Sequence, residues 1–348
     1  MQTKNLDVVS VGEILIDFVG KQSNCPLAEV TDFHRAAGGG PANVAVGVAR
    51  LGGRAGFIGK VGRDAFGDHL QKVLEENGVD TRGLLRDDAA NTTLVFVALN
   101  ERAVPEFVFF RHGTADTRLD PAELPQKVLA DTRILHFSSV SLAVEPARSA
   151  TLEAVRLARA AGAIISFDPN LRLSLWPDAA KARQELLEAV KLADIVKLND
   201  GELRFLLGSK AETLAAGAMA LLARGPRLVA VTLGEQGALL AGKESKIQLP
   251  ALPVQAVDTT GAGDAFMAGM LVVLAEAIQQ GMDPGVLDSA WLERLGRWGN
   301  AAAALTCTRP GVMPALPIRG EVGKLVTQGT NNSATGVENQ GSIDNSTG

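Results

Sequence analysis

Between residues 134 and 232, short apolar segments alternate with longer segments of helical composition. The apolar segments, each a candidate strand, cover 134–137, 163–167, 195–197 and 228–232. The candidate helices cover 147–161, 179–192, 201–207 and 211–223. This alternation predicts an α/β fold with a mostly parallel sheet and helices on both faces. Because parallel sheets bind ligands at the carboxyl ends of their strands, polar residues that follow these strands are candidate site residues.

The flanking segments extend this pattern on both sides. Before residue 134 we expect helices at 43–51 and 65–77, a hairpin turn at 100–104, and strands at 7–18, 27–37, 54–61, 91–98 and 106–110. After residue 232 we expect strands at 238–249 and 253–257 and helices at 261–277 and 291–306. The composition changes from residue 321 onward, and 327–348 is rich in Asn, Ser, Gly and Gln, which predicts disorder.

The composition narrows the class of protein. The chain has 348 residues, of which 46% are hydrophobic, enough for one large α/β domain or two smaller ones. A formal net charge of −5 without a basic stretch gives little support for nucleic-acid binding. The start lacks a signal-peptide stretch, and the apolar run 265–274 is shorter than the ~20 residues that span a bilayer. Cys25 and Cys307 lie far apart in the sequence, which is typical of free thiols in a reducing compartment. We therefore expect a soluble, cytoplasmic protein without a membrane partner.

The most specific motif is Asp258-Thr259-Thr260-Gly261-Ala262-Gly263-Asp264-Ala265-Phe266, between a candidate strand and a long apolar helix. Gly261 and Gly263 allow a tight turn that exposes backbone N–H groups at the helix N-terminus, where anions bind. A carboxylate at Asp264 would repel phosphate, but it suits a base that accepts the proton of an attacking hydroxyl. A plain N-cap is the alternative. A P-loop is excluded, because no glycine loop is followed by Lys and Ser or Thr.

The motif at 258–266 resembles the C-terminal signature of the ribokinase, or PfkB, family of carbohydrate kinases. The segments 38–45, 51–53 and 59–67 are similar to the N-terminal signature, and the resemblance covers roughly residues 6–318. It implies a ribokinase-like three-layer α/β/α fold with a small β-sheet lid. The implied kinase domain is 1–320, with a lid from about 12–36 and 91–118 and a disordered tail at 321–348. The resemblance also makes Asp264 the catalytic base and Gly261, Ala262 and Gly263 the anion hole.

A second motif, Asn-x-x-Glu, follows the candidate strand at 195–197. Asn199 and Glu202 have the spacing of a capping box, in which each side chain bonds the other residue's backbone N–H. In the family, the same motif organises magnesium and phosphates, and the Glu acts through water, which suits the hydration of Mg²⁺. Both roles can hold at once. The resemblance therefore implies that Lys197, Asn199 and Glu202 bind the ATP and Mg²⁺ cofactors.

Other carried-over positions concern the nucleotide and a monovalent cation. Thr232 and Gly234 match a segment that in the family touches the phosphates and ribose of ATP, although a simple turn is the alternative. Asn300 matches a position near the adenine, and tight helix packing explains its small neighbours equally well. The family also has a loop whose backbone carbonyls coordinate K⁺. The matching residues are Asp258, Thr260, Thr306, Arg309 and Gly311.

The sugar end of the implied site draws on residues from the lid. In a strand, Asp17 falls on the opposite face from Ile16, and without context it would face solvent. By resemblance, the sugar-binding set is Asp17, Gly38, Gly39, Asn43, Phe109, Arg111 and Asp264. A hairpin with Phe109 in the core and Arg111 in water is the alternative. Arg172, in Asp-Pro-Asn-Leu-Arg, would neutralise charge on the phosphates as a bidentate donor.

The segments around Asp17, Arg111 and Arg172 are most similar to those of fructokinases. The implied reaction converts ATP and D-fructose to ADP and D-fructose 6-phosphate. His112-Gly113-Thr114 replaces the usual Asn-Pro-Ser, which leaves 2-keto-3-deoxygluconate open as the substrate, with a nucleoside third. A catalytically inactive regulatory protein is the alternative from another class, although Gly261, Gly263 and Asp264 are all intact. The resemblance also allows a homodimer through the lid.

Overall fold

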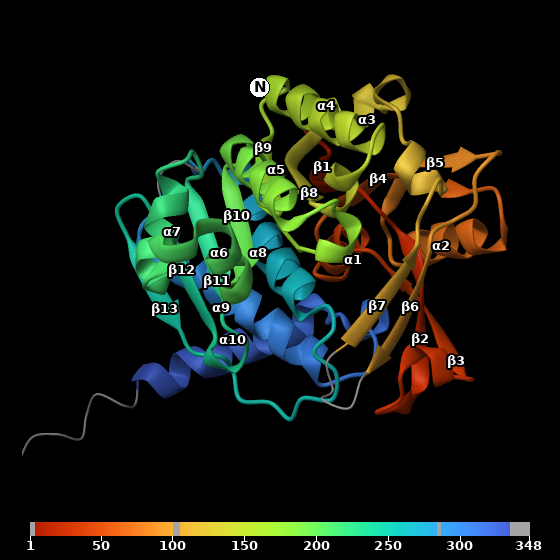
Figure 1. The fold of residues 1–348 in the computed structure, drawn as a ribbon. Coiled ribbons are helices and arrows are strands. Elements are labelled where there is room, and N and C mark those ends of the chain that lie inside the picture. The colour runs from red at the N-terminus through yellow and green to blue at the C-terminus, as the bar shows by residue number, and fades with distance from the viewer. Residues whose placement is uncertain (1–3, 100–104, 284–286, 335–348) are drawn as a thin grey trace, which may run out of the picture.

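The computed structural model describes residues 4–99, 105–283 and 287–334, whose strands form two sheets (Figure 1). The strands of the large sheet are β1 (Leu6–Val11), β4 (Ala55–Gly62), β5 (Asp80–Asp87), β8 (Thr132–Ser138), β9 (Ile164–Asp168), β10 (Ile195–Asn199), β11 (Leu228–Thr232), β12 (Ala238–Gly242) and β13 (Lys246–Leu249). Their order is β13-β12-β11-β10-β9-β8-β1-β4-β5. Neighbours are parallel except β11 with β12 and β12 with β13, so the predicted mostly parallel sheet is confirmed.

Helices cover both faces of the large sheet (Figure 1). One hydrophobic core lies under α1 (Gly40–Arg50), α2 (Ala65–Glu76), α8 (Ala262–Gln279), α9 (Ser289–Cys307) and α10 (Arg319–Ala334). The other lies under α3 (Gln126–Ala130), α4 (Ala147–Ala160), α5 (Ala179–Leu192), α6 (Asp200–Leu207) and α7 (Leu214–Leu222). Val8 packs in the first core and Val9 in the second, because successive strand residues point to opposite faces. This is the three-layer α/β/α arrangement that the sequence predicts.

The small sheet contains β2 (Leu15–Ser23), β3 (Phe33–Gly38), β6 (Leu94–Leu99) and β7 (Pro105–Phe110), in the order β3-β2-β6-β7. It projects from the side of the large sheet near β4 and β5 (Figure 1). The parallel pair β2–β6 lies between two antiparallel pairs. Leu15, Val95 and Val97 share one face with Phe107 and Phe109. Hence one face of this sheet is apolar at its centre.

The expected single strand at 7–18 is two strands in different sheets. The chain turns at Gly12, which has φ +148 and whose N–H donates to Ile58 O at 3.0 Å. A Cβ at Gly12 would lie 2.8 Å from Cγ of Pro41, so a larger residue would not fit there. The β-rich composition runs through the turn, and sequence periodicity therefore misses the break.

Other expected elements also differ from the structure. The strand expected at 253–257 is absent from the described residues, and β5 was not expected from the sequence. The single strand expected at 238–249 is the β12–β13 hairpin. The helix α10 extends into the segment that the sequence predicts to be disordered. The expected turn at 100–104 and the tail at 335–348 lie outside the described residues.

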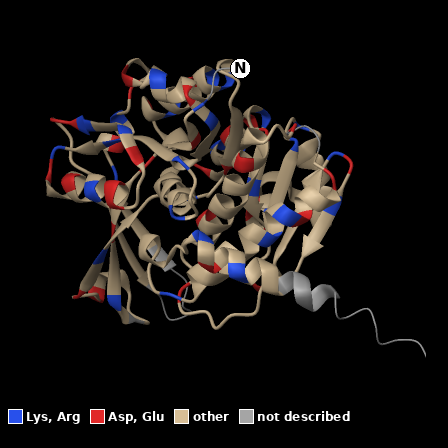
Figure 2. Cartoon of the chain, turned by 180° about the vertical axis from the view of Figure 1, so that it is seen from behind, with Lys and Arg blue, Asp and Glu red and all other residues tan. Residues whose placement is uncertain are grey.

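Among the described residues, α8 is long and apolar enough to cross a membrane, and a bent pair of helices around α6 and α7 passes the same test. However, α8 is 67% buried inside the fold, where it packs against α1 and α9 as a core helix does. Acidic and basic residues are mixed along the elements seen from behind (Figure 2). The charged residues therefore do not form a face of a single sign in that view.

Candidate active site

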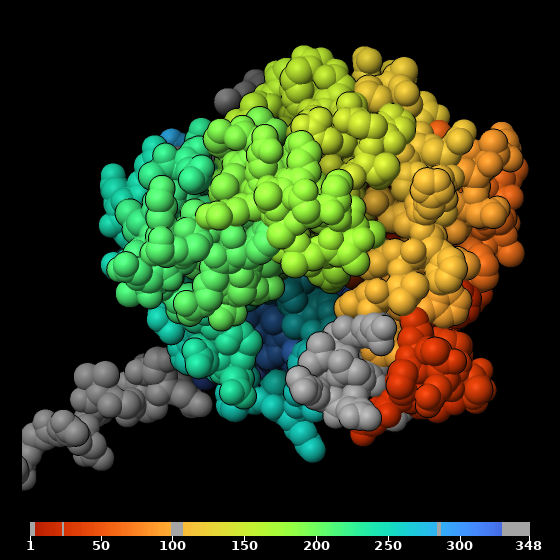
Figure 3. Space-filling model, in the orientation of Figure 1, coloured from red at the N-terminus to blue at the C-terminus, as the bar shows by residue number. Residues whose placement is uncertain are grey.

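A cleft of about 930 Å³ lies at the carboxyl ends of β9, β10 and β11. In the space-filling view, the surface is hollowed beside the lime-green segment that follows β9 (Figure 3). The cleft brings together the predicted phosphate and nucleotide residues, which come from distant parts of the sequence. Its lining includes Arg172, Lys197, Asn199, Glu202, Thr232, Gly234, Thr260, Gly261, Ala262, Gly263 and Asp264.

The start of α8 forms one wall of the cleft. Gly261 is its N-cap in the left-handed conformation, with φ +79, and a Cβ there would lie 2.4 Å from Cγ1 of Val312. Ala265 N–H is bonded back to Gly261 O at 2.9 Å. Amides of the first turn before that point have no partner within the helix and lie at its positive dipole end, and Ala262 N–H donates to Thr259 O at 3.2 Å. The turn therefore places helix N-terminal N–H groups beside Asp264, and their role as an anion hole stays a prediction.

Asp264 is 9% exposed and lies in the first turn of α8. Its Oδ2 accepts a hydrogen bond from Nδ2 of Asn43, on α1, at 2.8 Å. Burial raises the pKa of the Asp264 carboxyl to about 6, although the nearby Lys197 ammonium opposes this rise. A carboxyl with a pKa close to neutral is suited to accept and release a proton at physiological pH.

Lys197 and Asp168 form a buried ion pair beneath this turn. The Nζ of Lys197 lies 2.5 Å from Oδ2 of Asp168, and the side chains are 7% and 3% exposed. A Cβ at Gly263 would lie 2.9 Å from the same Nζ, so the ammonium lies directly against the glycine turn. Burial opposes the charge of Lys197, but the carboxylates of Asp168, Glu202 and Asp264 raise its pKa. The cleft therefore keeps a cation directly against the amides of the glycine turn.

Glu202 and Asn199 form the predicted capping box at the start of α6. Asn199 Oδ1 accepts from Glu202 N at 2.8 Å, and Glu202 Oε2 accepts from Asn199 N at 2.9 Å. The other oxygen of Glu202 accepts from Leu171 N at 2.8 Å. Burial, followed by the charge of Asp168, raises the pKa of Glu202. Glu202 thus joins α6 to the segment that carries Arg172.

Arg172 reaches across the cleft toward the small sheet. Its guanidinium carbon lies 5.3 Å from the ring centroid of Phe107, on β7. The positive charge also opposes the rise in pKa of both Asp17 and Asp264. Arg172 therefore lies in the cleft, and its contact with the phosphates stays a prediction.

The predicted sugar residues from the small sheet converge at one edge. Asp17 lies on the strand face of Leu15 and Val95, toward the cleft, and burial raises its pKa to about 7. A Cβ at Gly38 would lie only 1.9 Å from Oδ2 of Asp17, so the carboxylate covers that glycine. Gly39 has φ +109. A Cβ at Gly39 would lie 2.5 Å from Glu13 O, so both positions require glycine, and their approach to the sugar stays a prediction.

Two predicted sugar residues have other contacts. Phe109 packs in the small-sheet cluster, whereas Phe107, on the same face, lines the cleft. Arg111 is buried, with its Nε 2.7 Å from Oδ2 of Asp116. Its Nη2 has no hydrogen-bond partner among the described residues. His112 is exposed, which matches the surface role that is common for histidine.

At the nucleotide end, Thr232 and Gly234 line the cleft, and Gly234 has φ +58 with open space around it. Asn300, on α9, is 8% exposed, and its Nδ2 donates to Pro250 O at 3.0 Å. It is not among the described residues that line the cleft. The structure therefore assigns Asn300 a packing contact and leaves its predicted place near the adenine as a prediction.

The predicted cation-loop segments lie side by side. Asp258 accepts hydrogen bonds from Thr260 N at 2.9 Å and from Gly311 N at 3.0 Å. Thr306 is fully buried in α9, and its carbonyl accepts Arg309 N at 3.3 Å. The side chain of Arg309 is paired with Glu321. The side chain of Asp258 thus joins the two segments, and their role as a cation loop stays a prediction.

Sequence reasoning did not single out several residues of the site. Asp168 pairs with Lys197, Phe107 contacts Arg172, and Asn170 lines the cleft in the left-handed conformation, with φ +37. Glu13 is buried beside Gly40. Asp168 and Asn170 were available as polar residues directly after a strand, whereas the contacts of Phe107 and Glu13 are made across the fold.

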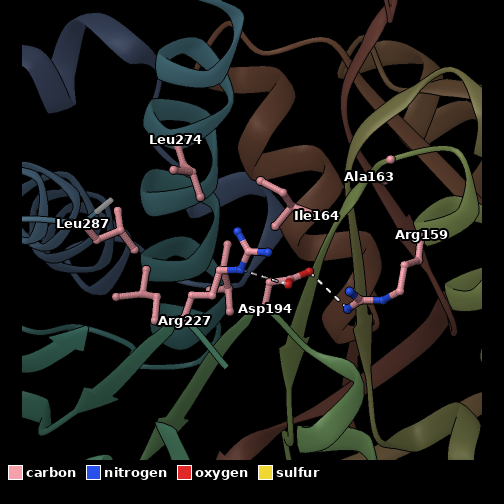
Figure 4. A pocket seen from close by; sticks show the side chains of 10 residues that line it. Arg159, Ala163, Ile164, Asp194, Arg227, Leu274 and Leu287 are labelled. Carbon is pink, nitrogen blue, oxygen red and sulfur yellow. Dashed lines mark hydrogen bonds and ion pairs between the residues drawn. The ribbon is translucent and has the colours of Figure 1, made fainter. Parts of the chain in front are cut away.

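A second cavity, of about 310 Å³, lies at the opposite end of the strands (Figure 4). Asp194 is at its centre, with Nη2 of Arg159 at 3.1 Å and Nε of Arg227 at 3.6 Å. Its walls include Leu274 and Leu287. The Asp194 carboxylate also accepts a hydrogen bond from Ile165 N at 2.9 Å. Asp194 therefore connects the starts of neighbouring strands, at the end of the sheet away from the polar cleft.

Comparisons with known proteins agree with this geometry. The family model described as pfkB family carbohydrate kinase matches residues 5–319. Probable fructokinase-4 of Arabidopsis thaliana is 43% identical over 320 residues, which are 92% of this chain and 96% of that protein. The solved fructokinase of Xylella fastidiosa with bound ATP has a TM-score of 0.83 at 35% identity, covering 93% of this chain and 99% of that one. A double-mutant fructokinase of Vibrio cholerae O395, bound to fructose, ADP and potassium, has a TM-score of 0.81 at 33% identity, covering 93% and 100%.

Proposed function

Since the chain belongs to the pfkB family of carbohydrate kinases, we propose that it is an ATP-dependent fructokinase. It would transfer the γ-phosphoryl group of ATP to D-fructose and release ADP and D-fructose 6-phosphate. The observation that carries the proposal is Asp264, whose carboxylate lies in the first turn of α8, in the cleft that Lys197 and Arg172 also line. Relatives such as the 43% identical probable fructokinase-4 support fructose as the acceptor.

In this proposal, Asp264 is the general base. Its Oδ2 is bonded to Asn43, so we assign Oδ1 to accept the proton of the sugar hydroxyl. As that proton leaves, the hydroxyl oxygen bonds to the γ-phosphorus and the bond from phosphorus to the β–γ bridging oxygen breaks. The amides of Gly263 and its neighbours, together with Arg172, stabilise the charge on the transferred group.

We assign ATP to the cleft residues Lys197, Asn199, Thr232 and Gly234. The Lys197 ammonium next to the glycine turn suits phosphates, and the left-handed Gly234 leaves open space for the nucleotide. Asp168, Asn199 and Glu202 offer hard oxygen ligands on the same cleft, which fit Mg²⁺ bound mostly through water. When bound, Mg²⁺ would neutralise phosphate charge.

We further propose that K⁺ binds the loop formed by 258–260 and 306–311. The support is that Asp258 bonds the backbones of Thr260 and Gly311, which holds the two segments in contact. The similar fructokinase of Vibrio cholerae was solved with potassium. Backbone carbonyls of Thr306 and Arg309 would complete the set of ligands.

Other proposals concern the whole chain. One face of the small sheet, on which Phe18 also contacts Phe66 of α2, carries stacked and edge-on aromatic rings, among them Phe18, Phe96 and the 59% exposed Phe110. This apolar face supports a homodimer through the small sheet. We also propose that the chain consists of a kinase domain at 1–320, with a lid at about 12–36 and 91–118, and a tail at 321–348. The free thiols of Cys25 and Cys307 support a cytoplasmic location.

The test of the proposed function is ADP release with ATP, Mg²⁺ and K⁺ against a panel of acceptors. The panel contains fructose, 2-keto-3-deoxygluconate, ribose and adenosine. We expect a clear preference for fructose in kcat/KM. Arg111 is already neutralised by Asp116, which leaves less positive charge for the carboxylate of a sugar acid.

Each result of the panel is informative. Preference for the keto-acid would retain the kinase and its base but replace fructose as the substrate. Absence of ADP release with every acceptor, from folded protein that binds ATP, would contradict the kinase and favour an inactive regulatory protein. A mock reaction without acceptor measures the background hydrolysis of ATP.

The pH profile is expected to follow Asp264. Because burial raises the pKa of Asp264 to about 6 and only the carboxylate accepts a proton, kcat/KM for fructose should fall as pH drops below about 6. One titrating base predicts a limb of about tenfold per pH unit. The measurement is kcat/KM between about pH 5 and pH 8. In Asp17→Asn we expect lower activity but the same limb, because that change removes the raised carboxyl of the small sheet and leaves Asp264 in place; a flat profile would contradict the assignment.

A further inference from the structure

We propose that Glu13 is a positioning residue for phosphoryl transfer: its carboxylate fixes the start of α1, and α1 holds Asn43 against Asp264. This inference rests on the proposed function, because Asp264 is the base only if the chain is a kinase. Glu13 lies where the chain passes from β1 to β2 and is 3% exposed. The mechanism above does not use it. A carboxyl buried this deeply is costly unless its oxygens are bonded, so its contacts indicate its role.

The contacts of Glu13 are with two ends of regular structure. Its Oε1 accepts from Gly40 N, the first residue of α1, at 3.0 Å. Its Oε2 lies 3.5 Å from Oγ of Ser138, the last residue of β8. The N-cap of α1 is Gly39, which has no side chain to satisfy the first amides. Glu13 therefore caps α1 from a different element, where a negative charge also matches the helix dipole.

The local backbone requires this indirect cap. Gly39 has φ +109, and a Cβ there would lie 2.5 Å from Glu13 O, so no Ser, Asp or Asn can replace it as the cap. A Cβ at Gly40 would lie 2.5 Å from Nδ2 of Asn170. The start of α1 is thus packed between Glu13 and Asn170, and its position depends on both.

The first turn of α1 connects this contact to the reacting carboxyl. Asn43 N donates to Gly39 O at 2.8 Å, so Asn43 lies one turn after the capped amide. Its side chain is 5% exposed, and Nδ2 donates to Oδ2 of Asp264 at 2.8 Å. A shift of the first turn would therefore move the amide away from Asp264 and misorient the oxygen that accepts the proton.

Charged groups around Glu13 come from the segment after β7. Arg111 and Asp116 face it, the first lowering and the second raising its pKa, while burial has the largest effect and raises the pKa to about 7. Both protonation states keep an oxygen that can accept from Gly40 N–H. The proposal consequently depends on the acceptor oxygen and not on the charge. Glu13→Gln keeps this oxygen, whereas Glu13→Met removes it.

The experiment compares four variants with the unmodified chain in the ADP-release assay with fructose. Glu13→Met removes the acceptor at similar size, and kcat is expected to fall about 10- to 10²-fold, as misplaced catalytic groups do, with a smaller change in KM. Glu13→Gln keeps the acceptor and should restore most of kcat. Asn43→Leu should show a similar loss. Glu13 and Asn43 both act through the contact between Asn43 and Asp264. The double variant Glu13→Met with Asn43→Leu should therefore have a kcat only slightly below that of the more impaired single variant.

A matched control is Glu185→Met, which removes a buried carboxylate on α5 that pairs with Arg148 and Lys181 outside the cleft. It should unfold more easily while kcat stays unchanged. Full kcat in Glu13→Met, or losses that multiply in the double variant, would overturn the proposal. If the unmodified chain phosphorylates none of the panel sugars, the proposed function fails separately. The same set of variants is then measured by urea unfolding. If the Glu13 and Asn43 changes have additive effects on the free energy of unfolding, the positioning role is overturned. A departure from additivity equal to a factor of about 2 or more in the unfolding equilibrium constant supports it.

Discussion

Asp264→Asn is expected to lower kcat by about 10²–10⁴-fold, the usual contribution of a general base, while the chain keeps its fold. The side chains are nearly isosteric, and the new amide oxygen can still accept from Nδ2 of Asn43. What is lost is the carboxylate that takes the proton of the hydroxyl. The measurements are kcat at saturating ATP and fructose and the urea midpoint of unfolding.

The control for this variant is Asp288→Asn. Asp288 caps α9 by accepting Trp291 N at 2.9 Å, and Asn is an equally good N-cap, so both kcat and stability should be unchanged. Retention of full turnover in Asp264→Asn would exclude Asp264 as the base. Loss of the fold in this variant would instead mean that the carboxyl is needed for structure, and kcat would then be measured in Asp264→Glu.

Lys197→Met is expected to lower the free energy of unfolding by about 3–5 kcal/mol, because it leaves the buried Asp168 carboxylate without its partner. The Nζ–Oδ2 distance is 2.5 Å, and both side chains are almost fully buried, so water cannot take the place of the ammonium. The double variant Lys197→Met with Asp168→Asn removes both charges and should recover much of this loss. Urea unfolding of the three chains measures the effect.

An exposed pair provides the comparison. Lys191 and Glu188 lie 2.6 Å apart on α5 with side chains 49% and 58% exposed, and Lys191→Met should cost less than about 1 kcal/mol. An equally small effect for Lys197→Met would contradict the view that the cation is buried and required. Since Lys197 also lies against Gly263, the variant should lose ATP binding as well, which a binding titration would detect.

Local motifs allowed the phosphate side of the site to be predicted from sequence. The glycine turn before Asp264 and the capping box of Asn199 and Glu202 depend on residues within four positions of one another, and both are present as expected. Arg172, which follows a strand of the parallel sheet, was also expected in the cleft because of the family resemblance, and it lines the cleft. Alternating composition was enough to predict the three layers.

Contacts across the fold could not be predicted in the same way. Phe107 and Phe109 share a strand face, and only the placement of the small sheet against the cleft decides that Phe107 meets Arg172. The pairing of Lys197 with Asp168 joins neighbouring strands β10 and β9, whose register is a property of the whole sheet. Glu13 was predicted to be part of a strand, because the β-rich composition of 7–18 gives no sign of the turn at Gly12.

The contact between Arg172 and Phe107 joins the proposed nucleotide and sugar sides of the cleft. Arg172 belongs to the segment that follows β9 of the large sheet and interacts with phosphates in the proposed mechanism, whereas Phe107 belongs to the small sheet that also carries Asp17. A nucleotide that draws the guanidinium toward its phosphates weakens its hold on the aromatic ring, and a sugar that repositions the small sheet changes the same contact. By thermodynamic reciprocity, the factor by which ATP changes the affinity for fructose equals the factor by which fructose changes the affinity for ATP.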